Sequence, residues 1–206
     1  MMRNRNVFAL LGAALIVTAC GGGEAQDESM EEMPEGGGEA TMVADGPLTS
    51  CFLARGTLAE AAERPSPLRA IQLSGDVGTL CWGAPSVKGR TIFGELELYD
   101  ETWRMGANEA TALHLTSAAT LGGIALEPGS YSLYAVPGTE SWEIFVNSNA
   151  ERWGIPIDDG VMSTNIGSFT VNAESTDGLV ETLTYTAAGG VITMEWENTR
   201  ISMPMM

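Results

Sequence analysis

Residues 85–111 are where this chain concentrates side chains that could do chemistry. The segment is rich in turn-forming pairs and carries Lys88, the only lysine of the chain, close to Arg90. Four further candidates follow it: Trp103, Arg104, Asn108 and Glu109. Ammonium and guanidinium groups bind anions, an amide both donates and accepts hydrogen bonds, and a desolvated carboxyl group can act as a general acid or base. These residues therefore form a candidate ligand-binding set, with Glu109 as the candidate catalytic residue.

The same residues have a second interpretation, in which they only hold a long loop in shape. Arg104 and Glu109 can pair if the loop folds back on itself, and Asn108 can satisfy backbone groups. Trp103 is an apolar anchor that would pin the loop to a core. We therefore expect Arg104 and Glu109 to pair beneath the loop. We also expect Trp103 to be buried and Asn108 to bond to the backbone.

The elements that must hold this segment read as β-strands. The expected strands are residues 70–73, 77–82, 110–116, 129–136, 142–147, 167–173, 180–186, 191–196 and 200–203. Turn signals separate them, among them Gly122-Gly123, Pro137-Gly138, Asp177-Gly178 and Gly189-Gly190. Because no long helical period interrupts the strands, they predict an all-β domain. We expect an antiparallel β-sandwich of about nine strands, with a jelly roll as one form that it can take.

The start of the domain contributes one short N-terminal helix and a cysteine. Thr57 and Glu60 form a capping-box pattern, and Pro65 must end the run that follows. Cys51 precedes this helix and Cys81 lies in an expected strand. In an oxidising compartment the two cysteines predict a disulfide bond, with two buried free thiols as the alternative. Closing a loop of about 30 residues would stabilise the fold by about 3.5 kcal/mol in the chain-entropy model.

The first residues of the chain carry a targeting pattern. Arg3 and Arg5 precede an apolar run, residues 7–19, that is too short to span a bilayer as a helix. Residues 17–20, Val-Thr-Ala-Cys, resemble a bacterial lipobox. They predict a lipoprotein signal peptide over residues 1–19. Cys20 would then be diacylglyceryl-modified, with palmitate as an acyl chain, and would become the mature N-terminus. An ordinary signal peptide with an incidental cysteine is the alternative.

This pattern predicts an address in the bacterial cell envelope, where the lipid on Cys20 would anchor the protein to a membrane. The glycine that follows Cys20 favours the outer membrane, with its periplasmic and its surface face both open. Residues 20–46 are mostly glycine and acidic residues, which predicts a disordered linker before a single domain over residues 47–206. The chain has 27 acidic against 10 basic residues and a net charge of −17, which argues against nucleic acid as a partner.

The sequence predicts no cofactor and no metal site. It has neither a G-x-G-x-x-G run nor a phosphate-binding P-loop. The one histidine, His114, falls on the polar face of the strand expected at residues 110–116, where a surface position is the simplest interpretation. A zinc site or a Ser-His-Asp triad would have to use His114. No metal-ligand spacing and no nucleophile-elbow pattern accompanies it.

Two motifs in the segment resemble a known family. Residues 89–94 read GR-x-IFG and residues 103–111 read WR-x-GANEAT, and the resemblance continues in residues 127–133, 142–147, 153–154 and 193–199. The set is similar to the domain-of-unknown-function 2911 family of bacterial secreted proteins, over residues 64–203. That family has no established activity, so the resemblance implies a fold and a location only. Leu68 and Ala84 stand where the family usually has a histidine and an arginine.

Two functional hypotheses follow. The first is a non-catalytic binding domain of a cell-envelope lipoprotein, which presents the loop to a small polar ligand or a protein partner. The second is a hydrolase or isomerase of an envelope metabolite, with Glu109 as general acid or base and Arg90 or Arg104 holding an anionic group. The missing histidine and arginine favour the first hypothesis. The surroundings of Glu109 discriminate further, because a catalytic carboxyl group faces an open pocket, whereas a structural one is saturated by internal partners.

Overall fold

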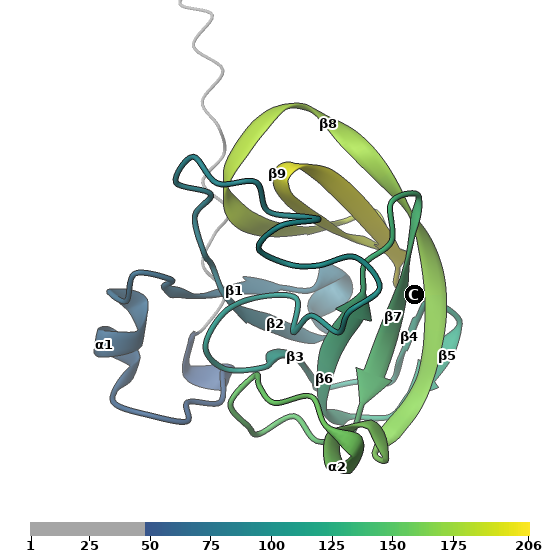
Figure 1. Ribbon diagram of the computed structural model, residues 1–206. Helices are drawn as coiled ribbons and strands as arrows, with labels where there is room; N and C mark the ends of the chain where they lie inside the picture. The colour runs from purple at the N-terminus through teal and green to yellow at the C-terminus, as the bar shows by residue number, and fades with distance from the viewer. Residues whose placement is uncertain (1–47) are drawn as a thin grey trace, which may run out of the picture. The chain divides into compact units, whose positions relative to one another are not determined.

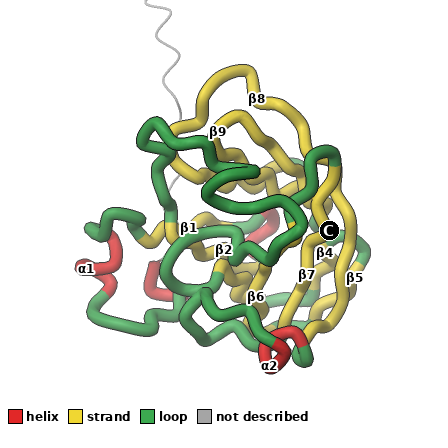
Figure 2. The backbone as a smooth tube through the Cα atoms, viewed as in Figure 1, coloured by secondary structure: helices red, strands yellow, loops and turns green. Residues whose placement is uncertain are grey.

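The computed structural model describes residues 48–206. The elements in chain order are η1 (Leu48–Ser50), α1 (Leu58–Ala62), β1 (Leu68–Gln72), η2 (Ser74–Asp76), β2 (Gly78–Gly83), β3 (Thr111–Leu115), β4 (Ala119–Leu121), β5 (Ile124–Leu126), β6 (Gly129–Val136), β7 (Ser141–Asn147), α2 (Asp159–Met162), β8 (Asn165–Ala188) and β9 (Val191–Pro204). The predicted signal peptide, the Cys20 anchor and the linker lie outside the described residues. Figure 2 shows that the connection between β2 and β3 is mostly loop.

One antiparallel sheet dominates the domain, with the strand order β1-β2-β3-β6-β7-β8-β9. It curls strongly into a half-barrel (Figure 1), as the right-handed twist of β-sheets allows. The curl brings β2 and β8 together although they are far apart in strand order. The indole N–H of Trp82 donates to the carbonyl of Leu183 at 3.1 Å, and Ser86 forms an antiparallel bridge with Thr182. The remaining strands, β4 and β5, form a separate hairpin across the predicted Gly122-Gly123 turn.

The two C-terminal strands are much longer than expected. β8 spans 24 residues and β9 spans 14, so each merges two predicted strands, and Asp177-Gly178 lies inside β8 and is not a turn. The register of the β8–β9 pair shifts between Ser175 and Val180, and again between Val180 and Thr184. Extra residues in one strand of a pair bend the strand without ending it. This bulged part of β8 explains why turn-type residues occur in the middle of a strand.

An aromatic cluster lies at the centre of the core. Phe93 packs edge-on against Trp103, Trp142 and Trp196 at centroid distances of 5.4, 4.8 and 5.9 Å. Trp103 also stacks on Trp196 at 5.8 Å. Phe93 and Trp103 come from the β2–β3 connection, whereas the other two rings come from β7 and β9. The cluster therefore pins the long connection to the strands, since burying such a side chain contributes about 1.5–3 kcal/mol.

The prediction of a mostly β, antiparallel domain is confirmed. The arrangement differs from the two facing sheets of a sandwich, because one sheet curls around the core and the long, bent strands β8 and β9 continue it. Two short α-helices are present where one was expected. Helix α1 starts at the predicted capping box of Thr57 and Glu60, and α2 starts at Asp158, whose side chain accepts from the backbone of Val161. Within residues 48–206, no helix has the length and apolar character needed to cross a membrane.

Candidate functional site

Glu109 is buried, with 4% of its side chain exposed, and its carboxylate has internal partners on both oxygens. Nη1 of Arg64 donates to Oε1 at 3.0 Å and to Oε2 at 2.9 Å. The backbone N–H of Ala54 donates to Oε1 at 3.3 Å. Glu109 therefore ties the N-terminal extension (residues 48–67) to the signature segment (residues 85–111).

The expected Arg104–Glu109 pair is wrong. Nε of Arg104 donates to the carbonyl of Gly106 at 3.0 Å, and the acidic charge that acts on Arg104 belongs to Glu97. Burial lowers the pKa of Arg104, and the Glu97 carboxylate raises it. Burial in turn raises the pKa of Glu97, against the effect of Arg104. Nearness in sequence suggested the wrong partner, because folding brings Arg64 to Glu109 from 45 residues upstream.

Asn108 bonds to the backbone, as expected. Its side-chain amide donates to the carbonyl of Ser66 at 2.9 Å, and its own carbonyl accepts from the N–H of Gly154 at 2.8 Å. Its φ of 66° lies in the left-handed region, which asparagine tolerates better than most residues. A Cβ atom at position 154 would lie 2.4 Å from Cδ of Arg104, so this close packing requires the glycine. Asn108 and Glu109 together fix residues 64–66 of the N-terminal extension.

Trp103 is buried, as expected, and only 3% exposed. Its backbone pairs with Ala135 in both directions, at 2.7 and 2.8 Å, and its ring lies in the aromatic cluster. Trp103 is therefore a core residue, although it also figured among the candidate ligand-binding residues.

Lys88 and Arg90 sit on a tight turn at the opposite end of the signature segment. Lys88 and Gly89 both adopt the left-handed conformation, with φ of 50° and 69°, and the backbone N–H of Arg90 closes the turn on the carbonyl of Val87 at 3.2 Å. The Arg90 guanidinium is held by backbone: Nε donates to Val87 at 2.9 Å and Nη2 to Ser86 at 2.6 Å. Within residues 48–206, neither Lys88 nor Arg90 forms a salt bridge. Both side chains therefore keep N–H donors for a partner.

A hollow of about 380 Å³, called here the basic hollow, lies beside this turn. It is lined by Pro65, Ser66, Ser86, Lys88 and Arg90. One wall belongs to the N-terminal extension and the other to the signature segment. In the part of the chain that the structure describes, no carboxylate belongs to the lining. The nearby Glu181 accepts from the backbone N–H of Lys88 at 2.9 Å. The contacts of Asn108 and Glu109 hold the first wall in place opposite the two cations.

The predicted disulfide between Cys51 and Cys81 is present, with Cα atoms 5.8 Å apart. It joins the N-terminal extension to β2. The bond therefore adds a covalent hold on the extension that supplies one wall of the basic hollow. Among the described residues, no group of three or more histidine, cysteine, aspartate or glutamate side chains is placed to bind a metal ion.

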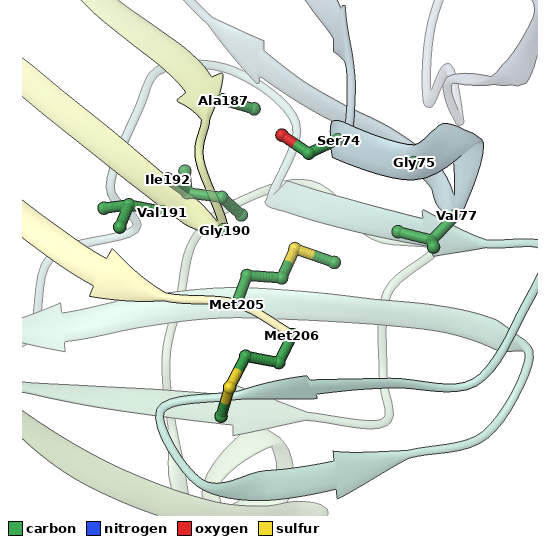
Figure 3. A pocket seen from close by; sticks show the side chains of 9 residues that line it. All are labelled: Ser74, Gly75, Val77, Ala187, Gly190, Val191, Ile192, Met205 and Met206. Carbon is green, nitrogen blue, oxygen red and sulfur yellow. The ribbon is translucent and has the colours of Figure 1, made fainter.

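Two other hollows differ from the basic one in character. An apolar hollow of about 300 Å³ lies by the β8–β9 turn and η2, and Figure 3 shows the Met205 side chain between that turn and Val77. A polar hollow of about 320 Å³ lies over β2, β3 and β6, with His114 in its lining. His114 is half-buried, Nδ1 lies 2.9 Å from Oγ of Ser130, and burial lowers the pKa of His114. Neither hollow contains a residue predicted for the site.

Sequence reasoning missed four residues that line or support the candidate site: Arg64, Pro65, Ser66 and Ser86. Ser66 and Ser86 each stand next to a proline, which signals a chain reversal and not a binding role. Arg64 carries no local signal, because its partner lies 45 residues away. Only the packing of the N-terminal extension on the signature segment reveals these roles.

The curled antiparallel sheet and the long, pinned loop define a mostly β domain with a candidate site built from loops. Residues 69–205 match the family model described as "Protein of unknown function (DUF2911)". Because the match covers more than half of the chain, the chain belongs to this family. No curated protein and no solved structure matches it. Arg64, Pro65 and Ser66 precede the matched residues, so part of the basic hollow lies outside the family domain.

The two residues that depart from the pattern implied by the resemblance are neighbours in the fold. Leu68 pairs with Gly83 across β1 and β2, and the N–H of Ala84 donates to the carbonyl of Pro67 at 2.8 Å. Leu68 and Ala84 are 2% and 1% exposed. Apolar side chains therefore fill the positions of the histidine and the arginine that the resemblance implies.

Proposed function

We propose that this protein is a non-catalytic, lipid-anchored protein of the cell envelope whose domain binds a small polar ligand in the basic hollow. The observation that carries the proposal is the contrast between Arg90 and Glu109. Arg90 keeps donors beside a hollow, whereas both oxygens of Glu109 have internal partners. General acid–base catalysis requires a carboxyl group within hydrogen-bond reach of a substrate. The hydrolase or isomerase alternative therefore gains no support from the surroundings of Glu109.

A thermal-shift screen of the full chain tests the binding proposal. The library should contain small anionic, cationic and neutral polar compounds, so that it favours no ligand class. A ligand present at about 100 times its Kd stabilises the native state by about 2.7 kcal/mol, which raises the melting temperature measurably. We expect at least one compound to do so in the wild type and not in Arg90→Ala. A screen in which every stabilising compound acts equally on Arg90→Ala would place binding elsewhere and contradict the proposal.

The lipid anchor needs a separate test, because Cys20 lies outside the described residues. We expect the chain to incorporate a palmitate analogue in growing cells and to partition with membranes. Cys20→Ala should abolish the incorporation, since acylation requires the thiol. Wild-type chain that stays unlabelled would refute the anchor without affecting the binding proposal.

A further inference from the structure

We infer that the ligand of the basic hollow carries an anionic group and that Arg90 and Lys88 bind this group. The group is a phosphate, a sulfate or a carboxylate. This inference rests on the proposed function and narrows it from polar ligands in general to anions. It is carried by the charges of the lining, by the way in which Arg90 is held, and by the size of the hollow.

The lining is unusual for so acidic a chain. With 27 acidic against 10 basic residues, solubility does not require cations at this surface. Yet the only lysine of the chain lies in this lining beside Arg90, and among residues 48–206 no carboxylate belongs to the lining. Two acidic side chains have contacts of their own. Glu181, on β8, accepts from the backbone N–H of Lys88, and Glu97 is half-buried, with its pKa raised by burial and lowered by Arg104 and Arg90. The described lining of the hollow therefore carries two positive charges and no negative charge, with the Glu181 carboxylate beside the Lys88 backbone.

The Arg90 guanidinium is already ordered before any ligand arrives. Its hydrogen bonds to the carbonyls of Val87 and Ser86 use Nε and one N–H of Nη2, which leaves Nη1 and the second N–H of Nη2 for a ligand. A guanidinium fork matches the two oxygens of a carboxylate or phosphate, and fixing the fork in advance lowers the entropy cost of binding. Lys88 adds a mobile point charge on the same turn. Ser66 adds a neutral hydroxyl to the lining, whereas the hydroxyl of Ser86 lies 3.2 Å from that of Thr182.

The size of the hollow limits the ligand. About 380 Å³ is near the lower end of the range for ligand pockets, so the hollow suits one anionic group with a small attached part. The same anionic group could belong to a free small molecule or to the headgroup of a lipid. Both sources share the chemistry that Arg90 and Lys88 recognise, and only an experiment with both can separate them.

Because Lys88 is the only lysine, reductive methylation with ¹³C-formaldehyde places a single lysine probe in the hollow of the full chain. Methylation keeps the positive charge. Lys88→Arg assigns the signal against that of the α-amino group. Phosphate, sulfate and acetate are titrated separately at low ionic strength, beside glucose and choline as neutral and cationic probes. Vesicles of phosphatidylglycerol, compared with phosphatidylcholine, test the lipid headgroup as the source.

We expect at least one of the three anions, or the anionic vesicles, to shift the Lys88 signal with saturation. Arg90→Gln should weaken that binding by about ten-fold or more, since it removes a charge-assisted hydrogen bond. Arg200→Gln removes the same charge from a salt bridge with Glu195 and should leave the affinity unchanged. Equal weakening in both variants would reveal general charge screening and overturn the inference. Saturable binding of glucose or choline without binding of any anion would also overturn the inference, but the proposed function would stand. If no probe bound at all, both the inference and the proposed function would be refuted.

Discussion

Polar side chains at the two ends of the signature segment differ in whether the protein itself uses their hydrogen-bonding groups. At residues 88–90 the side chains of Lys88 and Arg90 are exposed beside a hollow. At residues 103–109, Trp103 and Glu109 are buried. Asn108 and Glu109 form hydrogen bonds with the N-terminal extension. The comparison teaches that residue type alone does not distinguish a site from a scaffold. What distinguishes them is whether the protein itself uses the donors and acceptors.

The largest expected effect is at Trp103. Trp103→Ala should lower the free energy of unfolding by about 3–5 kcal/mol, because it removes a ring from the aromatic cluster and leaves a cavity. Chemical denaturation measures this loss. Trp153→Ala is the matched control, since Trp153 is only half-buried and lies under the guanidinium of Arg55. Similar losses in the two variants would mean that Trp103 does not anchor the segment.

The disulfide should have the next largest effect. Replacing both Cys51 and Cys81 by serine should cost about 3.5 kcal/mol, because a loop of about 30 residues is then free in the unfolded chain. The variant should also bind ligand in the basic hollow more weakly than the wild type, since the extension that supplies Pro65 and Ser66 is less well held. Urea denaturation of wild type and variant checks the first effect. An unchanged unfolding midpoint would contradict it.

Substitution of Asn108 should have an intermediate effect on stability and should also affect binding at the other end of the signature segment. Asn108→Ala removes the hydrogen bond to the carbonyl of Ser66, which should cost about 1–2 kcal/mol. Binding in the basic hollow should weaken too, although Asn108 is absent from its lining. Thermal denaturation and ligand titration of the same samples test both effects. A loss of stability with unchanged affinity would contradict the expectation that Asn108 supports binding by holding Ser66 in place.

Substitution of Lys88 should have the smallest effect on the free energy of unfolding. Lys88→Gln should change the free energy of unfolding by less than about 0.5 kcal/mol, because the side chain is exposed and forms no salt bridge within residues 48–206. The same variant should lose affinity for an anionic ligand. A large loss of stability would show that Lys88 belongs to the scaffold.

Local patterns predicted the parts of the fold that depend on neighbours in sequence. The capping box of α1, the Gly189-Gly190 turn and the strand of residues 129–136 were all predicted from short windows and are present. The length of β8 could not be predicted in this way. Asp177-Gly178 is a turn signal wherever it occurs, and only pairing with β9 on both sides of the bulge keeps it inside a strand.

Only part of the candidate site could be predicted. Of the residues that line the basic hollow, Lys88 and Arg90 were predicted to bind a ligand, whereas Pro65, Ser66 and Ser86 were not. Composition and turn chemistry pointed to the residues of the signature segment, and burial of Trp103 followed from its type. The Arg64–Glu109 pair did not follow, because nothing in either local sequence encodes a contact across 45 residues. The walls of the basic hollow were hidden for the same reason. They meet only when the N-terminal extension packs on the signature segment.

The most direct test of the division between scaffold and site compares Glu109→Gln with Arg90→Gln in one denaturation experiment. Glu109→Gln leaves Arg64 without its carboxylate, so it should lower the free energy of unfolding by at least about 2 kcal/mol. Arg90→Gln should lower it less, by about 1 kcal/mol, because water can replace the two hydrogen bonds of the exposed guanidinium, which forms no salt bridge within the described residues. The reverse order, with Arg90→Gln the more destabilised variant, would contradict the account.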